Sequence, residues 1–148
     1  MHRWLLLVYK VSPTPSANRV YVWRKLKQLG AVLLHDAVWV LPATERTAEQ
    51  FQWLAAEITE MQGDAMLWEG ELKNRLQEDR LVQQFMTQVD KEYESLLAEL
   101  QRANPDLNGI SRQYQQVKLR EHFPSTLGEQ VRNALLSTRD RASGEEIE

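Results

Sequence analysis

The cationic side chains between residues 10 and 27 are the ones whose type and spacing point most directly to chemistry. Residues 1–46 carry seven Lys or Arg against two Asp or Glu, a charge of +5, and because the whole chain has a net charge of -3, the remaining residues sum to -8. A local block of this sign attracts anions even on an acidic protein. We therefore predict a nucleic-acid or oxyanion site formed by Lys10, Arg19, Arg24, Lys25 and Lys27.

Three interpretations of these cations stay open at this level. Bases along one helix face could contact nucleic-acid phosphates, and the affinity would then fall with salt because each neutralised phosphate releases counterions. Alternatively, Lys10 and Arg19 could hold a small oxyanion at the start of the helix, with help from backbone N–H groups. The third interpretation is that the charges only keep one helix face in water.

Other residue types that carry chemistry give little support for an enzyme. The histidines His2, His35 and His122 are far apart in sequence, and none has a second ligand type at a metal-binding spacing. His35 is followed by Asp36, but adjacent strand residues point to opposite faces, so this pair is poorly placed for acid–base work. The chain has no cysteine, phosphate-binding glycine loop or nucleophile elbow. We predict no catalytic residue, no metal site and no cofactor.

The five tryptophans are spread along the first 68 residues, one in each of five predicted elements. Trp23 and Trp53 lie near the apolar stripes of two predicted helices, and we expect both to pack in the core. Trp39 and Trp68 lie on predicted strands and could face either the helices or the open side of a sheet. Stacking against nucleic-acid bases is the alternative role for such rings.

The elements that must position these residues begin with a strand and an amphipathic helix. A continuous apolar run over residues 5–11 predicts a buried strand, which a Pro/Ser loop ends. Ser16 is a candidate cap for a helix to about Leu29, with Gly30 as the left-handed stop. The expected packing face of this helix includes Val22 and Leu26.

Two short strands, a second helix and an edge strand follow. Residues 31–34 and 37–41 are apolar and strand-like, and His35-Asp36 is a plausible tight turn between them. Thr44 or Thr47 can cap the second helix, and the run from residue 64 to 72 predicts an edge strand with charged ends. The order β-α-β-β-α-β predicts a ferredoxin-like α+β sandwich with both helices on one face of an antiparallel sheet.

From residue 73 the apolar period changes to a helical one. Spacings of four and three predict a long helix with a heptad seam at Val82, Met86, Val89, Tyr93, Leu96, Leu100 and Ala103. Such a seam must be covered, either by a second subunit or by returning helices with stripes at Ile110, Tyr114 and Val117 and at Leu127, Val131 and Leu135. Ser125 or Thr126 can cap the last helix, and Thr126 with Glu129 would form a capping box.

These residues also resemble a known family. WLLLVYKV, the Pro/Ser loop, NRVYVWRKLKQLGA, AVWVLP and the closing LREHFPSTLGEQVRNALL are similar to the N-terminal domain of the ChrB family, associated with bacterial chromate resistance, and the similarity extends over almost the whole chain. The resemblance implies a regulatory protein that binds promoter DNA and responds to chromate. Full-length members usually carry a further C-terminal domain, which the resemblance to these 148 residues does not cover.

The first 70 residues look similar, more distantly, to the ferredoxin-like nucleases of CRISPR adaptation and to the middle domain of PaaX-type repressors. Those nucleases carry a Tyr-Asp pair at the end of the first strand, where the Asp binds a divalent metal. Here the pair is Tyr9-Lys10, and an ammonium group repels Mg²⁺ rather than binding it. The resemblance therefore implies the scaffold, and possible pairing of two copies through sheet edges, without metal-dependent cleavage at that position.

Composition sets the remaining expectations. A hydrophobic share of 43% and a charged share of 26% are ordinary for a globular protein, and the absence of cysteine fits the cytoplasm. We predict a ferredoxin-like subdomain at 1–72, a helical extension at 73–142 packed on it, and a disordered tail at 143–148. The predicted function is a non-enzymatic regulator or accessory protein of chromate resistance that binds DNA. The partners considered are DNA, chromate or another oxyanion, and a second copy in a homodimer, but no membrane. A degenerate nuclease-like protein and a dimeric protein-binding scaffold are the alternatives.

Overall fold

The computed structural model describes residues 2–147, and it describes side chains for residues 2–141. The chain divides into two compact units, residues 1–82 and residues 83–148. The predicted division at residue 72 stays a prediction. The predicted disordered tail falls on 143–148, outside the residues whose side chains are described.

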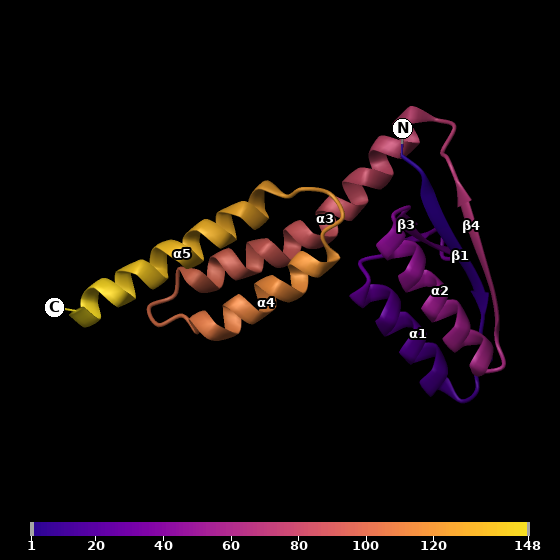
Figure 1. The fold of residues 1–148 in the computed structure, drawn as a ribbon, viewed down its shortest axis with the longest axis horizontal. Helices are drawn as coiled ribbons and strands as arrows, with labels where there is room; N and C mark the ends of the chain where they lie inside the picture. Colours follow the sequence, from indigo (N-terminus) through magenta and orange to yellow (C-terminus); the bar gives the residue numbers. More distant parts are fainter. Residues whose placement is uncertain (1, 148) are drawn as a thin grey trace. The chain divides into compact units, whose positions relative to one another are not determined.

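The first unit is a four-stranded antiparallel sheet with two helices on one face (Figure 1). The strands lie in the order β2-β3-β1-β4, which is the ferredoxin-like arrangement, so the predicted α+β fold is confirmed. The elements are β1 (Trp4–Lys10), α1 (Ser16–Gln28), β2 (Val32–Leu34), β3 (Val38–Pro42), α2 (Glu45–Glu60) and β4 (Asp64–Gly70).

Apolar side chains of both layers form the core of this unit. Leu7 on the central strand β1, Val22 and Leu26 on α1, and Phe51 and Ile58 on α2 are all fully buried. The spacing of four residues between Val22 and Leu26 places both on one side of α1, as predicted. The rest of the α1 surface carries exposed side chains, both charged ones and the aromatic rings of Tyr21 and Trp23.

The helix ends agree in part with the predicted capping residues. Gly30 has a φ of 76°, the left-handed conformation expected of the stop after α1. The predicted Ser16 cap is wrong, because Pro15 is the N-cap residue and no side chain caps α1. Thr44 and Thr47 act together at α2, since the Thr44 side chain accepts a hydrogen bond from the Thr47 backbone N–H at 3.1 Å.

The second unit is helical. It contains the C-terminal part of α3 (Arg75–Leu100), together with α4 (Leu107–Arg120) and α5 (Thr126–Ile147). The three helices bury a common core, so the returning helices do cover the seam of α3, as one of the two alternatives predicted. The fully packed members of this core are Val89, Tyr93, Leu96, Ile110, Val117, Val131 and Leu135.

The N-terminal part of the predicted heptad seam is shifted by one residue. Leu81 and Phe85 are buried at 3% exposure each, whereas Val82 and Met86 are only partly buried. From Glu78 to Leu96 the buried positions are spaced by three, four, four, four and three residues, which follows the 3.6-residue helical period and not the strict alternation of a heptad.

The start of α5 differs from the predicted capping box. The Ser125 hydroxyl accepts a hydrogen bond from the Gly128 backbone N–H at 3.1 Å, and it donates one to Asp90 Oδ1 at 2.6 Å. Ser125 is thus the cap, and Thr126 is the first helical residue. Within the described part of the chain, no helix is both long enough and apolar enough to cross a bilayer.

Candidate anion-binding groove

A groove of about 820 Å³ opens in the first unit beside α1. Its walls are the end of β1 with the loop that follows, one flank of α1, and the turn between β2 and β3. Loops and strand ends often carry the side chains that bind ligands. In this groove, side chains from all three elements can therefore contact the same ligand.

Three of the five predicted cations line this groove. Lys10 comes from the end of β1, and Arg19 and Arg24 are exposed residues of α1. The structure therefore places Arg19, Arg24 and Lys10 around the same groove. A concave surface with three positive charges and low-dielectric walls concentrates the field that attracts anions.

The other two predicted cations lie differently. The Lys27 Nζ atom is 5.7 Å from the ring centroid of Trp23, a cation–π contact that places it beside a groove residue. Lys25 is half-buried, and it is not among the residues that line the groove. The five cations of α1 and β1 are thus a set of three in the groove, one next to it and one outside it.

The groove cations have no carboxylate partner among the side chains that the structure describes. Within residues 2–141, Lys10, Arg19 and Arg24 take part in no ion pair, whereas Arg3 on the same unit pairs with Glu69 at 3.3 Å and Glu71 at 3.1 Å. An arginine without a protein partner keeps all five N–H donors for a ligand. The charge of the groove is therefore available for binding.

Aromatic rings form the rest of the chemical character of the groove. Tyr9, Trp23 and Trp39 line it together with the cations. Burial raises the pKa of the Tyr9 phenol, while a hydrogen bond with Trp39 and the positive charge of Arg19 act in the opposite direction. Tyr9 is consequently neutral at physiological pH, and its hydroxyl lies near both Trp39 and Arg19.

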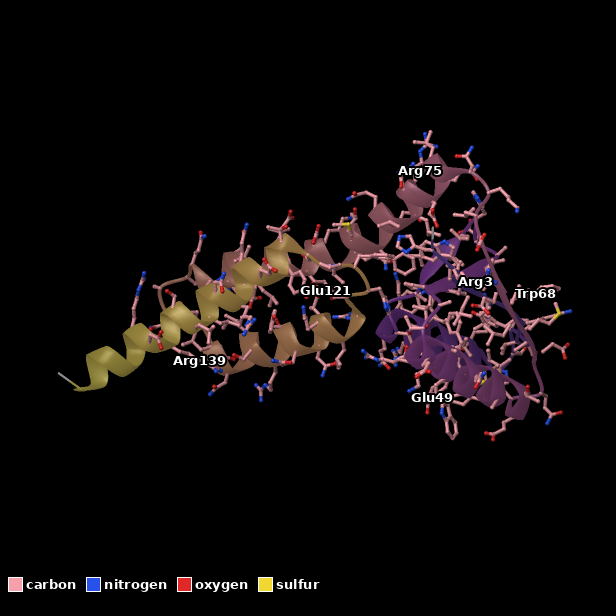
Figure 2. The ribbon with its side chains drawn as sticks, turned by 45° about the horizontal axis from the view of Figure 1, so that its top comes forward. Arg3, Glu49, Trp68, Arg75, Glu121 and Arg139 are labelled. Atoms are coloured by element: carbon pink, nitrogen blue, oxygen red, sulfur yellow. The ribbon has the colours of Figure 1, made fainter. Side chains whose placement is uncertain are left out.

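The prediction that Trp23 and Trp53 pack in the core is wrong. Trp23 is 50% exposed and Trp53 is 67% exposed, because each follows or precedes the buried stripe by one residue, which is a rotation of 100° around the helix. On the strands, Trp39 is 4% exposed and packs inside, whereas Trp68 is 58% exposed and lies on the outer side of β4 (Figure 2).

The turn between β2 and β3 contributes one acid to the groove. His35 and Asp36 have φ angles of 51° and 61°, so both residues of the predicted tight turn adopt the left-handed conformation. Asp36 lines the groove and His35 does not, which separates the two side chains that were considered for acid–base work. Among the residues that the structure describes, no cluster of three or more His, Asp or Glu side chains could hold a metal ion.

Tyr9, Trp23, Trp39 and Asp36 also line the groove and were not predicted from the sequence as members of the candidate site. The available signal was positional: Tyr9 directly precedes Lys10, and Trp23 directly precedes Arg24. An aromatic ring next to a cation, twice within 16 residues, indicates a mixed surface that charge counting alone does not detect.

Comparison with known proteins covers both units. The family model described as "Protein ChrB, N-terminal" matches residues 19–121, which includes Arg19 and Arg24 and leaves Lys10 just before the match. The chain is 28% identical to "Protein ChrB" of Cupriavidus metallidurans over 107 residues, which are 71% of this chain and 32% of that protein. The chain thus spans about a third of the length of this relative.

Proposed function

The chain belongs to the family of the ChrB N-terminal domain, and from this membership we propose that it is a regulatory or accessory protein of bacterial chromate resistance that binds DNA. The binding surface is the flank of α1 together with the end of β1. Lys10, Arg19 and Arg24 contact phosphates there, and Lys27 adds charge beside them.

The observation that carries this proposal is the absence of carboxylate partners for the three groove cations within the described residues. A solvated helix face of a globular protein usually intersperses both signs of charge. In this groove three cations accompany one acid, Asp36. Such an excess favours a polyanion that can approach two elements at once.

The protein acts without catalysing cleavage of the nucleic acid. Lys10 occupies the end of β1, the position at which the similar nucleases carry a metal-binding acid. Asp36 is the single carboxylate among the groove residues, and one carboxylate does not make a two-metal site for phosphodiester hydrolysis.

Two further partners stay predictions. Because β4 lies at the edge of the sheet, its outer backbone groups support pairing of two copies through that edge, and Met66 and Trp68, exposed at 55% and 58%, add apolar surface on the adjoining sheet face. The oxyanion considered from the sequence, chromate or a similar ion, would compete with DNA phosphates for Arg19 and Lys10. A competition experiment with chromate and with sulfate distinguishes a specific effector from general screening by anions.

Fluorescence anisotropy of a labelled 30-base-pair duplex at 50 mM and 300 mM salt tests the proposal. We expect binding at 50 mM and a loss of roughly a hundredfold or more at 300 mM, since about three released counterions give that slope. The same duplex incubated with Mg²⁺ or Mn²⁺ should stay intact on a denaturing gel. Absence of binding at 50 mM contradicts DNA recognition, and metal-dependent cleavage that Asp36→Asn abolishes contradicts the non-enzymatic role.

A further inference from the structure

We propose that the groove accommodates one unpaired nucleotide, whose base contacts the aromatic side chains and whose phosphate contacts the cations. This inference rests on the proposed contact of the same surface with nucleic acid, and it adds a ligand of defined chemistry. The groove is the site, and Trp23, Arg19 and Arg24 are its principal binding residues.

The volume of the groove supports an organic ligand. A four-oxygen anion displaces only a few water molecules, each of about 30 Å³ in the liquid. The groove measures about 820 Å³, within the range of roughly 300–1,000 Å³ typical of sites that hold small organic molecules. An inorganic oxyanion would leave most of that space, and all of the aromatic surface, without a contact.

The aromatic surface supports a ligand with a flat ring. Trp23 lines the groove and is 50% exposed, whereas Trp39, the other tryptophan of the groove, is only 4% exposed. Lys27 lies over the ring of Trp23 at 5.7 Å and thereby helps to hold the indole in place. A fixed, half-exposed indole is a stacking surface for a nucleobase, worth about 1–3 kcal/mol per base in single-strand binding proteins.

The charged groups of the groove support a ligand that carries both a phosphate and a hydrogen-bond donor. Lys10, Arg19 and Arg24 supply cations for the phosphate. Asp36, in the turn between β2 and β3, supplies one carboxylate. A carboxylate accepts hydrogen bonds only, which suits a base amino group or a ribose hydroxyl and disfavours a ligand that is anionic throughout.

Nuclear magnetic resonance of the tryptophan indole N–H groups tests the proposal with controls inside the chain. The five indole signals are assigned with single Trp→Phe variants, and the full chain is titrated with AMP, adenosine, inorganic phosphate and a six-residue oligothymidylate. Trp53 and Trp68 are at least as exposed as Trp23 and lie outside the groove, so they report non-specific contact.

We expect saturable shifts of the Trp23 and Trp39 signals with AMP or with the oligonucleotide, and none for Trp53 and Trp68. Adenosine and inorganic phosphate, which each carry half of the recognised chemistry, should bind at least tenfold more weakly than AMP. Arg19→Gln should lower the affinity about tenfold, the effect of one charge-assisted hydrogen bond. Glu49→Gln, on an exposed residue of α2 away from the groove, is the control and should change nothing.

The titrations with AMP and with the oligothymidylate show whether the bound nucleotide is free or part of a strand. Binding of AMP as tight as that of the oligonucleotide assigns the groove to a free nucleotide, and binding of the oligonucleotide alone assigns it to an unpaired residue of a strand. The proposal is overturned if neither ligand shifts Trp23, or if all exposed tryptophans shift alike. Duplex affinity measured on the same samples keeps the two claims apart, because a protein that binds duplex without shifting Trp23 retains the proposed function and loses only this inference.

Discussion

The arginines in the packed helices of the second unit and those in the groove of the first unit have different partners. In the helical unit, Arg120 pairs with Glu92 at 3.0 Å, and Arg139 on α5 donates to Ser111 on α4 at 2.7 Å. In the ferredoxin-like unit, Arg19 and Arg24 line a groove and have no ion pair within the described residues. Two arginines of the second unit thus connect helices, while the two groove arginines have no ion pair among the described residues.

The aromatic side chains show the same contrast. Tyr93 in the helical unit is fully buried, lies 6.0 Å from the ring of Tyr114, and donates a hydrogen bond to Glu121 Oε1 at 3.2 Å. Trp23 in the ferredoxin-like unit is half exposed at the groove. The first unit therefore exposes an aromatic ring in a groove that cations also line, whereas the buried aromatic ring of the second unit is part of a packed core.

The largest expected effect is a difference in the free energy of unfolding between variants at Tyr93 and at Trp23. Tyr93→Ala should lower the free energy of unfolding by about 3–5 kcal/mol, because it empties a fully buried aromatic site. Trp23→Ala should cost less than about 1 kcal/mol, since the ring is half in water already. Urea unfolding followed by circular dichroism measures both, and equal losses would contradict the contrast between the units.

Two glycines give the next largest effect. A Cβ at Gly128 on α5 would lie 2.9 Å from the ring carbons of Tyr93, so Gly128→Ala should destabilise the protein by about 1–2 kcal/mol despite the better helix propensity of alanine. A Cβ at Gly70 at the end of β4 meets nothing within 4 Å, and Gly70→Ala should stay within about 0.5 kcal/mol. The same urea titrations compare them, with similar losses counting against close packing around Tyr93.

At acid pH the first unit should weaken through Glu78. The pKa of this buried carboxyl is lowered, first by the hydrogen bond from the His2 backbone N–H at 2.8 Å and also by the one from Trp4 Nε1 at 3.3 Å. A lowered pKa means stability that is present above the ordinary carboxyl pKa of about 4.3 and is lost as the pH falls through the native value. Urea midpoints between pH 3 and 6 should fall in the wild type and fall less in Glu78→Gln; parallel curves would contradict the assignment.

At alkaline pH the helical unit should weaken through Tyr93. Burial, and next the negative charge of Glu121, raise the pKa of this phenol. The neutral phenol is therefore the form that the fold stabilises, and this stability is complete below the ordinary phenol pKa of about 10 and declines as the pH rises above it. Tyr93→Phe should reduce the decline in urea midpoint between pH 9.5 and 11.5, and an unchanged slope would show that another group is responsible.

Much of the fold followed from the sequence because its signals are local. The Pro/Ser loop, Gly30 and the His35-Asp36 turn mark the ends of elements whose apolar runs differ in period, so the ferredoxin-like order could be predicted. The register of the α3 seam could not be, because a shift of one residue between Val82 and Leu81 depends on which partner side chains fill the core.

The site was predictable only in part, for the same reason. Lys10, Arg19 and Arg24 could be predicted as members of the candidate site, because an excess of positive charge in one stretch of sequence can be seen without tertiary information. The aromatic half of the groove depends on long-range placement: Trp39 reaches Tyr9 only through the pairing of β3 with β1. The sequence predicts Trp23 in the core because it directly follows Val22 on the helix. Whether a residue next to the buried stripe is itself buried depends on tertiary packing, which the sequence pattern does not show.

A charge-matched comparison of the two units tests the central claim most directly. The variant Lys10→Gln, Arg19→Gln, Arg24→Gln removes three positive charges from the groove, and Arg102→Gln, Arg112→Gln, Arg132→Gln removes three exposed ones from the helical unit. Duplex affinity is measured for each from 50 to 300 mM salt. The account predicts that the groove variant loses affinity and that its log–log salt slope falls by about 2–3, while the helical-unit variant keeps the wild-type slope. Equal losses in the two variants would show that only the total charge matters and would contradict it.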